Sequence, residues 1–167
     1  TLELLPILKA SAPARIVNVS SMAHYNARTI NFDILKKETT SLTGLPEYNV
    51  SKLANVLFTQ ELARRLDGTG VTTYSLHPGV VASDVWRNIS FPLNMVFELL
   101  VKPFMISNQK GALTSIYCAT SDDVGSESGR YYDKCKVKLP NKVTEDLTLA
   151  TALWEKSLEW AGVIDRP

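Results

Sequence analysis

Residues 47–66, EYNVSKLANVLFTQELARRL, have the pattern of a helix that buries one face and carries two polar groups on another. At about 100° per residue, Leu53 and Leu57 fall on one side of such a helix, whereas Tyr48 and Lys52 fall together on the opposite side. A phenol and an ammonium four positions apart on a helix are neighbours. The stretch therefore predicts a helix that packs on the core and also presents a pair of groups with useful chemistry.

Short apolar strands are expected on both sides of this helix in the sequence. Residues 14–21, ARIVNVSS, contain an apolar run that ends in two serines, and residues 71–77, VTTYSLH, are rich in β-branched side chains. A strand, a helix and a second strand in this order favour a right-handed crossover and a parallel sheet. In such sheets ligands bind beyond the carboxyl ends of the strands. Here those ends are the serines at 20–21 and the His-Pro-Gly at 77–79.

The flanking segments extend the same α/β pattern. We expect helices at residues 1–10, 108–120 and about 144–161, and a short aromatic strand, RYYD, at residues 130–133. Helices between strands would cover both faces of a parallel sheet. With 45% hydrophobic residues, the 167-residue chain can form a core, and we expect one domain or one piece of a domain over residues 1–167.

Charge and cysteine content exclude several classes of protein. Eighteen basic and seventeen acidic residues leave a net charge of +1, so the chain lacks the electrostatic pattern of a nucleic-acid-binding protein. The two cysteines, Cys118 and Cys135, are too few for a metal cluster or a disulfide framework and indicate free thiols in a reducing compartment. His24 and His77 lack nearby ligands at metal-binding spacing, so no metal site is expected. The absence of a G-x-S-x-G motif argues against a serine hydrolase.

The Tyr-x-x-x-Lys spacing is weak evidence by itself, because it occurs at both Tyr48–Lys52 and Tyr132–Lys136. The second pair falls in or just after a short strand, where an offset of four does not bring side chains together as it does on a helix. We therefore interpret Tyr132 as structural. The ordinary alternative for the first pair is a surface tyrosine and a solvated lysine. Its position between two strands that end in serines and in Pro-Gly favours a functional role.

Three motifs in order, RIVNVSS, YNVSK and HPGVVASDV, resemble the short-chain dehydrogenase/reductase family. The runs SKLANVLFTQELARRL and TGVTTYSLHPGVV are typical of its retinol dehydrogenase branch. The resemblance covers essentially all 167 residues, as the carboxyl-terminal half of the family's domain. It implies half of a Rossmann-like, doubly wound parallel sheet. The first, nucleotide-binding half is missing from these residues, as is its glycine-rich T-G-x-x-x-G-x-G turn.

The resemblance implies hydride transfer between a nicotinamide cofactor and an alcohol or carbonyl substrate. Tyr48 would exchange a proton with the substrate oxygen, Lys52 would also hydrogen-bond the nicotinamide ribose, and Ser21 would hold the substrate oxygen. These residue types suit the chemistry, since a phenol with a solution pKa of about 10 becomes more acidic beside an ammonium. We assign Ser21 rather than Ser20 because the second serine of the pair matches the family's catalytic position.

The expected cofactor is NADP, with NAD as the alternative, because the residue that selects between them is not among these residues. Gly79 matches a position where missing side-chain atoms let the backbone approach the nicotinamide, although a plain turn after the strand would also use glycine. Ser83 matches a position where many members carry a threonine that contacts the nicotinamide carboxamide. The expected cofactor-binding residues are Tyr48, Lys52, Pro78, Gly79, Val81 and Ser83.

An apolar stretch at about 84–106 matches the variable lid that folds over the substrate in this family. It could line a pocket for a long apolar substrate or contact a membrane surface at residues 89–106, with ordinary core packing as the alternative. Prolines and charges interrupt it, so it does not read as a membrane-spanning helix. By resemblance, the protein is expected at the endoplasmic reticulum membrane, facing the cytoplasm, through an anchor that this chain lacks.

Two interpretations from different classes remain open at this point. The leading one is an oxidoreductase acting on retinol, retinal or a similar lipid, with steroids and polyprenals as alternative substrates. Its activity is expected for the full-length protein and not for these residues alone, because the missing half would leave strand edges unpaired. The second is a truncated, non-catalytic family member that acts as a binding partner, for example as a homodimer through helix 47–66.

Overall fold

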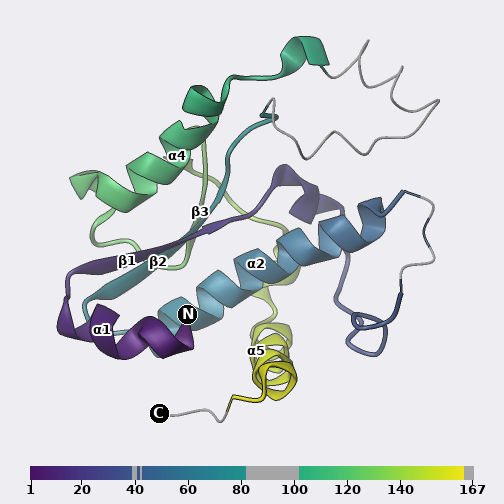
Figure 1. Ribbon diagram of the computed structural model, residues 1–167, viewed down its shortest axis with the longest axis horizontal. Coiled ribbons are helices and arrows are strands. Elements are labelled where there is room, and N and C mark those ends of the chain that lie inside the picture. Colours follow the sequence, from purple (N-terminus) through teal and green to yellow (C-terminus); the bar gives the residue numbers. More distant parts are fainter. Residues whose placement is uncertain (39–40, 42, 82–101, 164–167) are drawn as a thin grey trace.

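A four-stranded sheet forms the centre of the computed structural model, which describes residues 1–38, 41, 43–81 and 102–163 (Figure 1). The strand order is β1-β2-β3-β4, with β1 to β3 parallel and β4 antiparallel to β3. The predicted strands are confirmed, whereas β4, which forms a hairpin with β3, was not predicted. The strands are β1 Ala14–Val19, β2 Val71–His77, β3 Arg130–Asp133 and β4 Lys136–Val137.

Helices cover both faces of this sheet, as the α/β pattern predicts. Helices α2 and α5 lie on one face, and α4 lies on the other (Figure 1). The α-helices are α1 Leu5–Ala10, α2 Leu45–Arg65, α4 Asn108–Thr120 and α5 Leu147–Ala161. The 3-10 turns are η1 Leu2–Leu4, η2 Met22–Asn26, η4 Lys102–Phe104, η5 Asp122–Val124 and η6 Lys142–Glu145.

Two helix starts differ from their predicted positions for local reasons. Helix α2 begins two residues early, because Gly44 adopts a left-handed φ of 66° at its N-cap and Pro46 fits the first turn. Helix α5 begins at Leu147 rather than near residue 144. The Asp146 carboxylate caps it by accepting a hydrogen bond of 3.0 Å from a first-turn amide, and the preceding residues form the separate turn η6.

The predicted apolar stripe of α2 forms the core between this helix and α5. Leu53 and Leu57 are fully buried and pack with Leu153 of α5. Complete burial of one such leucine is worth roughly 1.5–3 kcal/mol relative to its exposure. On the other face of the sheet, Tyr74 and Tyr132 form a second buried cluster beneath α4. The strands therefore have packing on both faces, which explains why β2 is almost completely buried.

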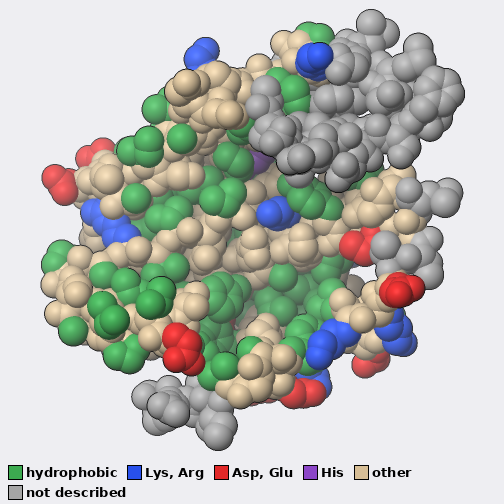
Figure 2. All heavy atoms as spheres, viewed as in Figure 1, with side chains coloured by type: hydrophobic (Ala, Val, Ile, Leu, Met, Phe, Trp, Pro, Cys, Tyr) green, Lys and Arg blue, Asp and Glu red, His purple; other side chains and the backbone are tan. Residues whose placement is uncertain are grey.

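The two neighbouring parallel strands β1 and β2 differ in burial. Six of the seven residues of β2 are buried, whereas those of β1 are half-buried or exposed, including Val19 at 46% exposure. Strand β1 pairs with β2 on one side and is, like β4, an edge strand among the described residues. Hydrophobic side chains also gather over the short helix α1 on the face seen in Figure 2. Leu4 of η1 and Ile7 of α1 are exposed.

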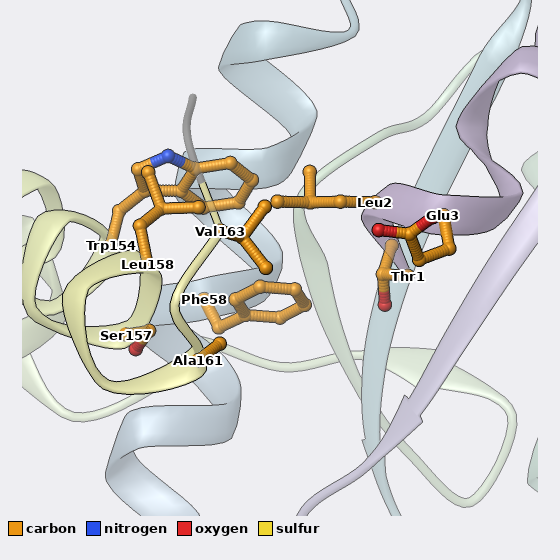
Figure 3. Close-up of a pocket in the computed structure, with 9 residues that line it drawn as sticks. All are labelled: Thr1, Leu2, Glu3, Phe58, Trp154, Ser157, Leu158, Ala161 and Val163. Carbon is orange, nitrogen blue, oxygen red and sulfur yellow. The ribbon is translucent and has the colours of Figure 1, made fainter. Parts of the chain in front are cut away.

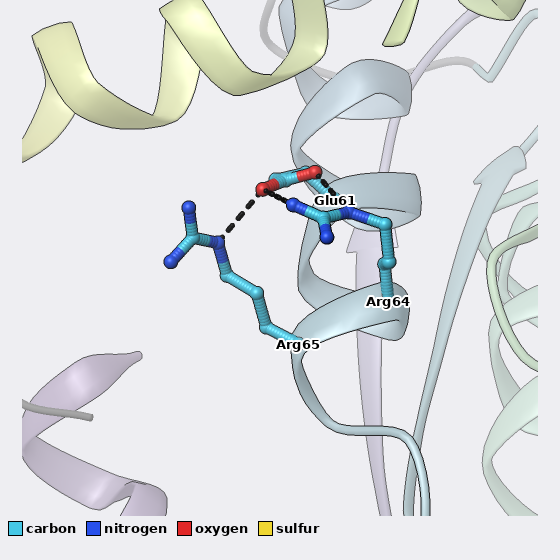
Figure 4. Close-up of polar contacts among 3 residues, drawn as sticks. All are labelled: Glu61, Arg64 and Arg65. Atoms are coloured by element: carbon cyan, nitrogen blue, oxygen red, sulfur yellow. Dashed lines mark hydrogen bonds and ion pairs between the residues drawn. The ribbon is translucent and has the colours of Figure 1, made fainter.

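A charged cluster of Glu61, Arg64 and Arg65 lies in the last turns of α2 (Figure 4). The buried Glu61 carboxylate accepts hydrogen bonds from Arg64 (2.6 and 3.0 Å) and from Arg65 Nε (2.8 Å). Burial by itself raises the pKa of Glu61, but the bonds and charges of the two arginines outweigh it and lower that pKa overall. The Arg65 guanidinium also lies 4.5 Å from the ring centroid of Trp154 in α5.

Candidate active site

Two hydrogen bonds attach the carboxyl end of β1 to the middle of α2. The Ser20 hydroxyl donates to the carbonyl oxygen of Lys52 at 2.7 Å, and the Asn55 side-chain amide donates to the carbonyl oxygen of Val19 at 3.0 Å. Ser21 directly follows these anchors and opens turn η2, which packs along α2. The structure thus brings Ser21 to the part of α2 that carries Lys52.

The two adjacent serines have different hydrogen-bonding roles. Ser20 is buried, and its hydroxyl proton is used in the bond to Lys52. The Ser21 oxygen instead accepts a hydrogen bond of 3.2 Å from the backbone amide of Ala23. Within the described part of the chain no acceptor takes the Ser21 hydroxyl proton, which leaves it able to donate to a ligand. This geometry supplies a physical reason to favour Ser21 over Ser20.

Tyr48 and Lys52 lie next to each other on the first turns of α2. The Lys52 Nζ atom is 5.4 Å from the centroid of the Tyr48 ring, and Tyr48 is 40% exposed. In the described ranges, no hydrogen bond joins the side chains of Ser21, Tyr48 and Lys52 to one another or to a protein acceptor. Two hydroxyl donors and one ammonium therefore remain available on adjoining elements, β1–η2 and α2.

The backbone conformation itself favours glycine at position 79, directly after Pro78. Gly79 has a φ of 95°, and a Cβ atom at this position would lie 2.6 Å from Cδ1 of Ile106. The positive φ disfavours any other residue whether or not a cofactor is bound, whereas a shift of the Ile106 side-chain end would relieve the contact. The expected contact of Pro78 and Gly79 with a nicotinamide remains a prediction.

The remaining predicted cofactor residues are only partly described. Val81 forms a parallel bridge with Ile106, and its Cγ2 atom would lie 2.5 Å from a Cβ at Gly111 of α4. Its side chain therefore packs against α4. Ser83 and most of the expected lid at 84–106 lie outside the described residues.

Both histidines are buried at the carboxyl end of the sheet. His24 Nδ1 lies 2.6 Å from the Ser21 carbonyl oxygen, and burial lowers its pKa, with that bond opposing the shift. Burial also lowers the pKa of His77, whereas Asp133 acts in the opposite direction. Across the described ranges, no three His, Cys, Asp or Glu side chains gather as a metal site. No sequence pattern predicted a role for His24, and the one local signal was its position three residues after Ser21.

The second Tyr-x-x-x-Lys pair has a different environment. Tyr132 is 1% exposed, and its hydroxyl donates a hydrogen bond to the Glu127 carboxylate. Burial and this carboxylate raise the pKa of Tyr132 well above its usual value. Lys136 is exposed on β4. The interpretation of Tyr132 as structural is therefore confirmed.

A separate hollow of about 230 Å³ lies between η1, α2 and α5 (Figure 3). It is mainly apolar and contains none of the predicted catalytic residues. The described helices also include none with the length and apolar character needed to cross a bilayer. The residues lining the hollow are Thr1, Leu2, Glu3, Phe58, Trp154, Ser157, Leu158, Ala161 and Val163.

Comparison with curated proteins identifies close sequence relatives. The chain is 44% identical over 163 residues to Retinol dehydrogenase 12 of Mus musculus, covering 98% of this chain and 50% of that protein. It is 46% identical over 162 residues to Retinol dehydrogenase 11 of Homo sapiens, covering 96% of this chain and 49% of that protein. The chain thus spans about half the length of the curated relatives it matches. No family model matches it.

Solved structures share the fold over a similar extent. A putative uncharacterized protein from Mycobacterium paratuberculosis aligns with a TM-score of 0.67 at 26% identity, covering 92% of this chain and 52% of that one. The Pseudomonas aeruginosa RhlG/NADP active-site complex aligns with a TM-score of 0.53 at 19% identity, covering 86% and 51% of the two chains. At this identity the second likeness shows the fold alone.

Proposed function

Because this chain belongs to the retinol dehydrogenase branch of the short-chain dehydrogenase/reductase family, we propose that it forms the catalytic half of an NAD(P)-dependent oxidoreductase. The reaction interconverts an alcohol and a carbonyl on a lipid substrate. The observation that carries this proposal is the bond from Ser20 to the Lys52 carbonyl oxygen, 2.7 Å long, which brings Ser21 beside the helix that carries Tyr48 and Lys52. On this proposal the three proton donors of Ser21, Tyr48 and Lys52 face one region.

Each of the three side chains has a distinct part in carbonyl reduction. Ser21 donates a hydrogen bond to the substrate carbonyl oxygen and polarises the bond. Tyr48 transfers its phenolic proton to that oxygen as the carbonyl carbon accepts a hydride, so the product is a neutral alcohol. Lys52 stabilises the phenolate that is left, which is then reprotonated from solvent. In alcohol oxidation the same proton and hydride move in reverse.

A nicotinamide cofactor, when bound, supplies or accepts the hydride. The residues present fit such a group, since Lys52 is half-buried and its ammonium donates to no described protein acceptor, leaving it free to bind ribose hydroxyls. We propose NADP(H), which is the cofactor named in a solved complex of the same fold. NAD(H) is the alternative, and tighter binding of NADH than of NADPH would favour it. The backbone at Pro78, Gly79 and Val81, together with Ser83, is proposed to complete the nicotinamide site.

Retinol and retinal are the proposed substrates, because the two curated relatives are named for retinol. Steroids and polyprenals are the competing substrates. The exposed edge of β1, where apolar residues are only half-buried, is proposed to pair with a nucleotide-binding half of the sheet. Activity is therefore assigned to the assembled domain. Association with the endoplasmic reticulum membrane stays a prediction from the family resemblance.

The test joins this chain to the matched first half of Retinol dehydrogenase 12 of Mus musculus and compares the product with the chain alone. We expect NADPH-dependent reduction of retinal by the joined protein and none by the chain alone. Steroid and polyprenal aldehydes or ketones, each with NADPH and NADH, complete the panel. A Ser21→Ala/Tyr48→Phe double variant is the matched control.

Turnover that is equal in the double variant would overturn the proposed mechanism. An inactive joined protein that binds neither nicotinamide cofactor would overturn the enzyme assignment. In that case a dimeric chain, detected by analytical ultracentrifugation, would support the alternative role as a homodimeric partner through α2. If only steroids or polyprenals are turned over, the proposed reaction stands but the substrate class is not retinoid.

A further inference from the structure

The backbone of Ser21 is held by a residue on the following turn. Its carbonyl oxygen lies 2.6 Å from His24 Nδ1 and also accepts a hydrogen bond of 3.2 Å from the His24 backbone amide. His24 is fully buried, and its ring lies 4.6 Å from that of Tyr131 in an edge contact. The imidazole therefore cannot swing away without opening the core, and it sets the orientation of the Ser21 peptide.

A distant residue determines which nitrogen of His24 carries the proton. The backbone amide of Asn141 donates a hydrogen bond of 3.2 Å to His24 Nε2. A backbone amide can only donate, so Nε2 must be the accepting nitrogen and the proton of the neutral ring must lie on Nδ1. The Nδ1–H group then donates to the Ser21 carbonyl oxygen. Asn141 thus selects the tautomer that holds Ser21.

The Asn141 side chain binds the same turn at three further points. Its amide nitrogen lies 2.9 Å from the carbonyl oxygen of His24, 3.3 Å from that of Tyr25 and 2.7 Å from that of Ala27. Two amide protons serve these three acceptors, and the longest contact is the weakest of the set. These carbonyl groups belong to the end of η2 and to its C-cap, Ala27, and that of His24 also accepts a hydrogen bond of 3.3 Å from the Ala27 amide. Asn141 therefore holds both the imidazole and the backbone of the turn.

Asn141 is itself fixed within its own segment. Its side-chain oxygen accepts a hydrogen bond of 3.0 Å from the amide of Val143, which caps η6. Its carbonyl oxygen accepts from the amide and the hydroxyl of the buried Thr144, both at 2.8 Å. The hydrogen bonds of Asn141 to His24 and to the carbonyl groups of its turn form a clamp. This clamp joins two ordered turns that lie 117 residues apart in the sequence.

We propose that Asn141 is a positioning residue for Ser21, acting through His24 and the turn η2. This inference rests on the proposed oxidoreductase function and adds a residue that never touches the substrate. Loss of the clamp changes the direction in which the Ser21 hydroxyl meets the substrate oxygen. A misplacement of about 1 Å in such a group can reduce a rate by roughly 100-fold.

The test uses Asn141→Ser in the active, joined protein. Serine is as good an N-cap as asparagine, so the bond to Val143 and the start of η6 are retained, while the amide donors to the η2 carbonyl groups are removed. The matched control is Asn31→Ser, because Asn31 makes a similar local bond of 3.0 Å to the amide of Asp33 on the exposed surface. Both variants are also made in a Ser21→Ala background.

We expect Asn141→Ser to lower kcat roughly 10- to 100-fold, with the KM for NADPH changed less than about twofold. In the Ser21→Ala background the same change should cost less than about twofold, because the hydroxyl that it positions is already absent. Asn31→Ser should leave kcat unchanged in both backgrounds. An additive loss in the two backgrounds, or a lower melting temperature with normal kcat, would overturn the positioning role.

His24→Asn supplies the same readout if Asn141→Ser does not fold. Its amide can still donate near the Nδ1 position, but it lacks the acceptor for the Asn141 backbone amide. A non-additive loss of kcat with Ser21→Ala is again expected. If the unmodified joined protein shows no turnover with any substrate, the proposed function fails and this inference fails with it. If the joined protein is active but the losses of kcat are additive with Ser21→Ala, only the positioning role of Asn141 is refuted.

Discussion

The two Tyr-x-x-x-Lys pairs of this chain share a spacing but occupy opposite environments. Tyr48 is 40% exposed on a helix, with the Lys52 ammonium 5.4 Å from its ring centroid. Tyr132 is 1% exposed in a strand, with its hydroxyl bound to the Glu127 carboxylate. Its formal partner, Lys136, lies exposed across the hairpin opposite Asp133. The same four-residue spacing therefore places the Lys52 ammonium beside the Tyr48 ring, whereas the neighbour of the Tyr132 hydroxyl is a carboxylate.

This difference follows from backbone geometry and burial. On a helix, residues four apart lie on one face, whereas the hairpin turn between Tyr132 and Lys136 separates them. A cation favours the phenolate, while a buried site with a carboxylate favours the neutral phenol. Tyr48 therefore has the cation that its proposed role requires, whereas the environment of Tyr132 favours the neutral phenol.

The strongest test of this comparison is Tyr48→Phe in the active, joined protein. Because the proton donor is removed while the ring remains, kcat should fall roughly 100- to 10,000-fold. Cofactor affinity should stay within about threefold, measured by fluorescence titration with NADPH. Turnover close to that of the unmodified protein would refute the assignment of Tyr48 as the acid.

The lysines provide the second test, in which Lys52→Ala is compared with Lys136→Ala. Loss of the Lys52 ammonium should reduce kcat by about 100-fold and also weaken NADPH binding, since it is assigned to both the phenolate and the ribose. Lys136→Ala should change neither quantity. Unchanged NADPH affinity in Lys52→Ala, measured by titration calorimetry, would remove the proposed ribose contact.

The helix that carries Tyr48 should be sensitive to acid through Glu61. Burial raises the pKa of Glu61, but the bonds to the two arginines outweigh it and lower that pKa overall. The ionised carboxylate therefore stabilises the fold above the ordinary glutamate pKa of about 4.3, and this stabilisation is lost as the pH falls through the pKa of the folded state. Glu61→Gln should therefore cost roughly 1–2 kcal/mol at pH 7 and less as the pH approaches 3. Urea unfolding at each pH measures this difference.

Glu159→Gln is the matched control for that measurement, because Glu159 forms an exposed pair with Lys156 at 2.7 Å. Surface pairs of this kind contribute little to stability, so no measurable change is expected. A destabilisation by Glu61→Gln that is constant from pH 7 to pH 3 would contradict the assigned role of the ionised carboxylate.

The smallest expected effect is that of Tyr132→Phe, which should act on stability and not on catalysis. Burial and Glu127 raise the pKa of Tyr132 in the folded protein. The neutral phenol therefore stabilises the fold fully below the tyrosine pKa of the unfolded chain, about 10, and this stabilisation is lost as the pH rises above it. The variant should lose about 1 kcal/mol at pH 7 and progressively less above pH 10. Unfolding curves from pH 7 to 11 measure it, and a large loss of kcat would reverse the comparison.

Local sequence patterns were sufficient for most of the fold. The strands at 71–77 and 130–133 and the helix at 108–120 have the predicted bounds. Their residues specify them through hydrophobic periodicity, β-branched content and flanking turn residues, all of which act over a few positions. The start of α5 and the strand β4 were missed because a side-chain cap and a hairpin pairing depend on contacts that periodicity does not encode.

The sequence by itself determined the α/β class and singled out Ser21, Tyr48 and Lys52, because motif order and helical spacing are properties of short segments. Only the tertiary structure decided that Ser20 is an anchor and that Asn141 holds the turn after Ser21. Those contacts join residues 32 and 117 positions apart. Burial and hydrogen-bond geometry across such separations arise only when the chain packs, so no local pattern specifies them.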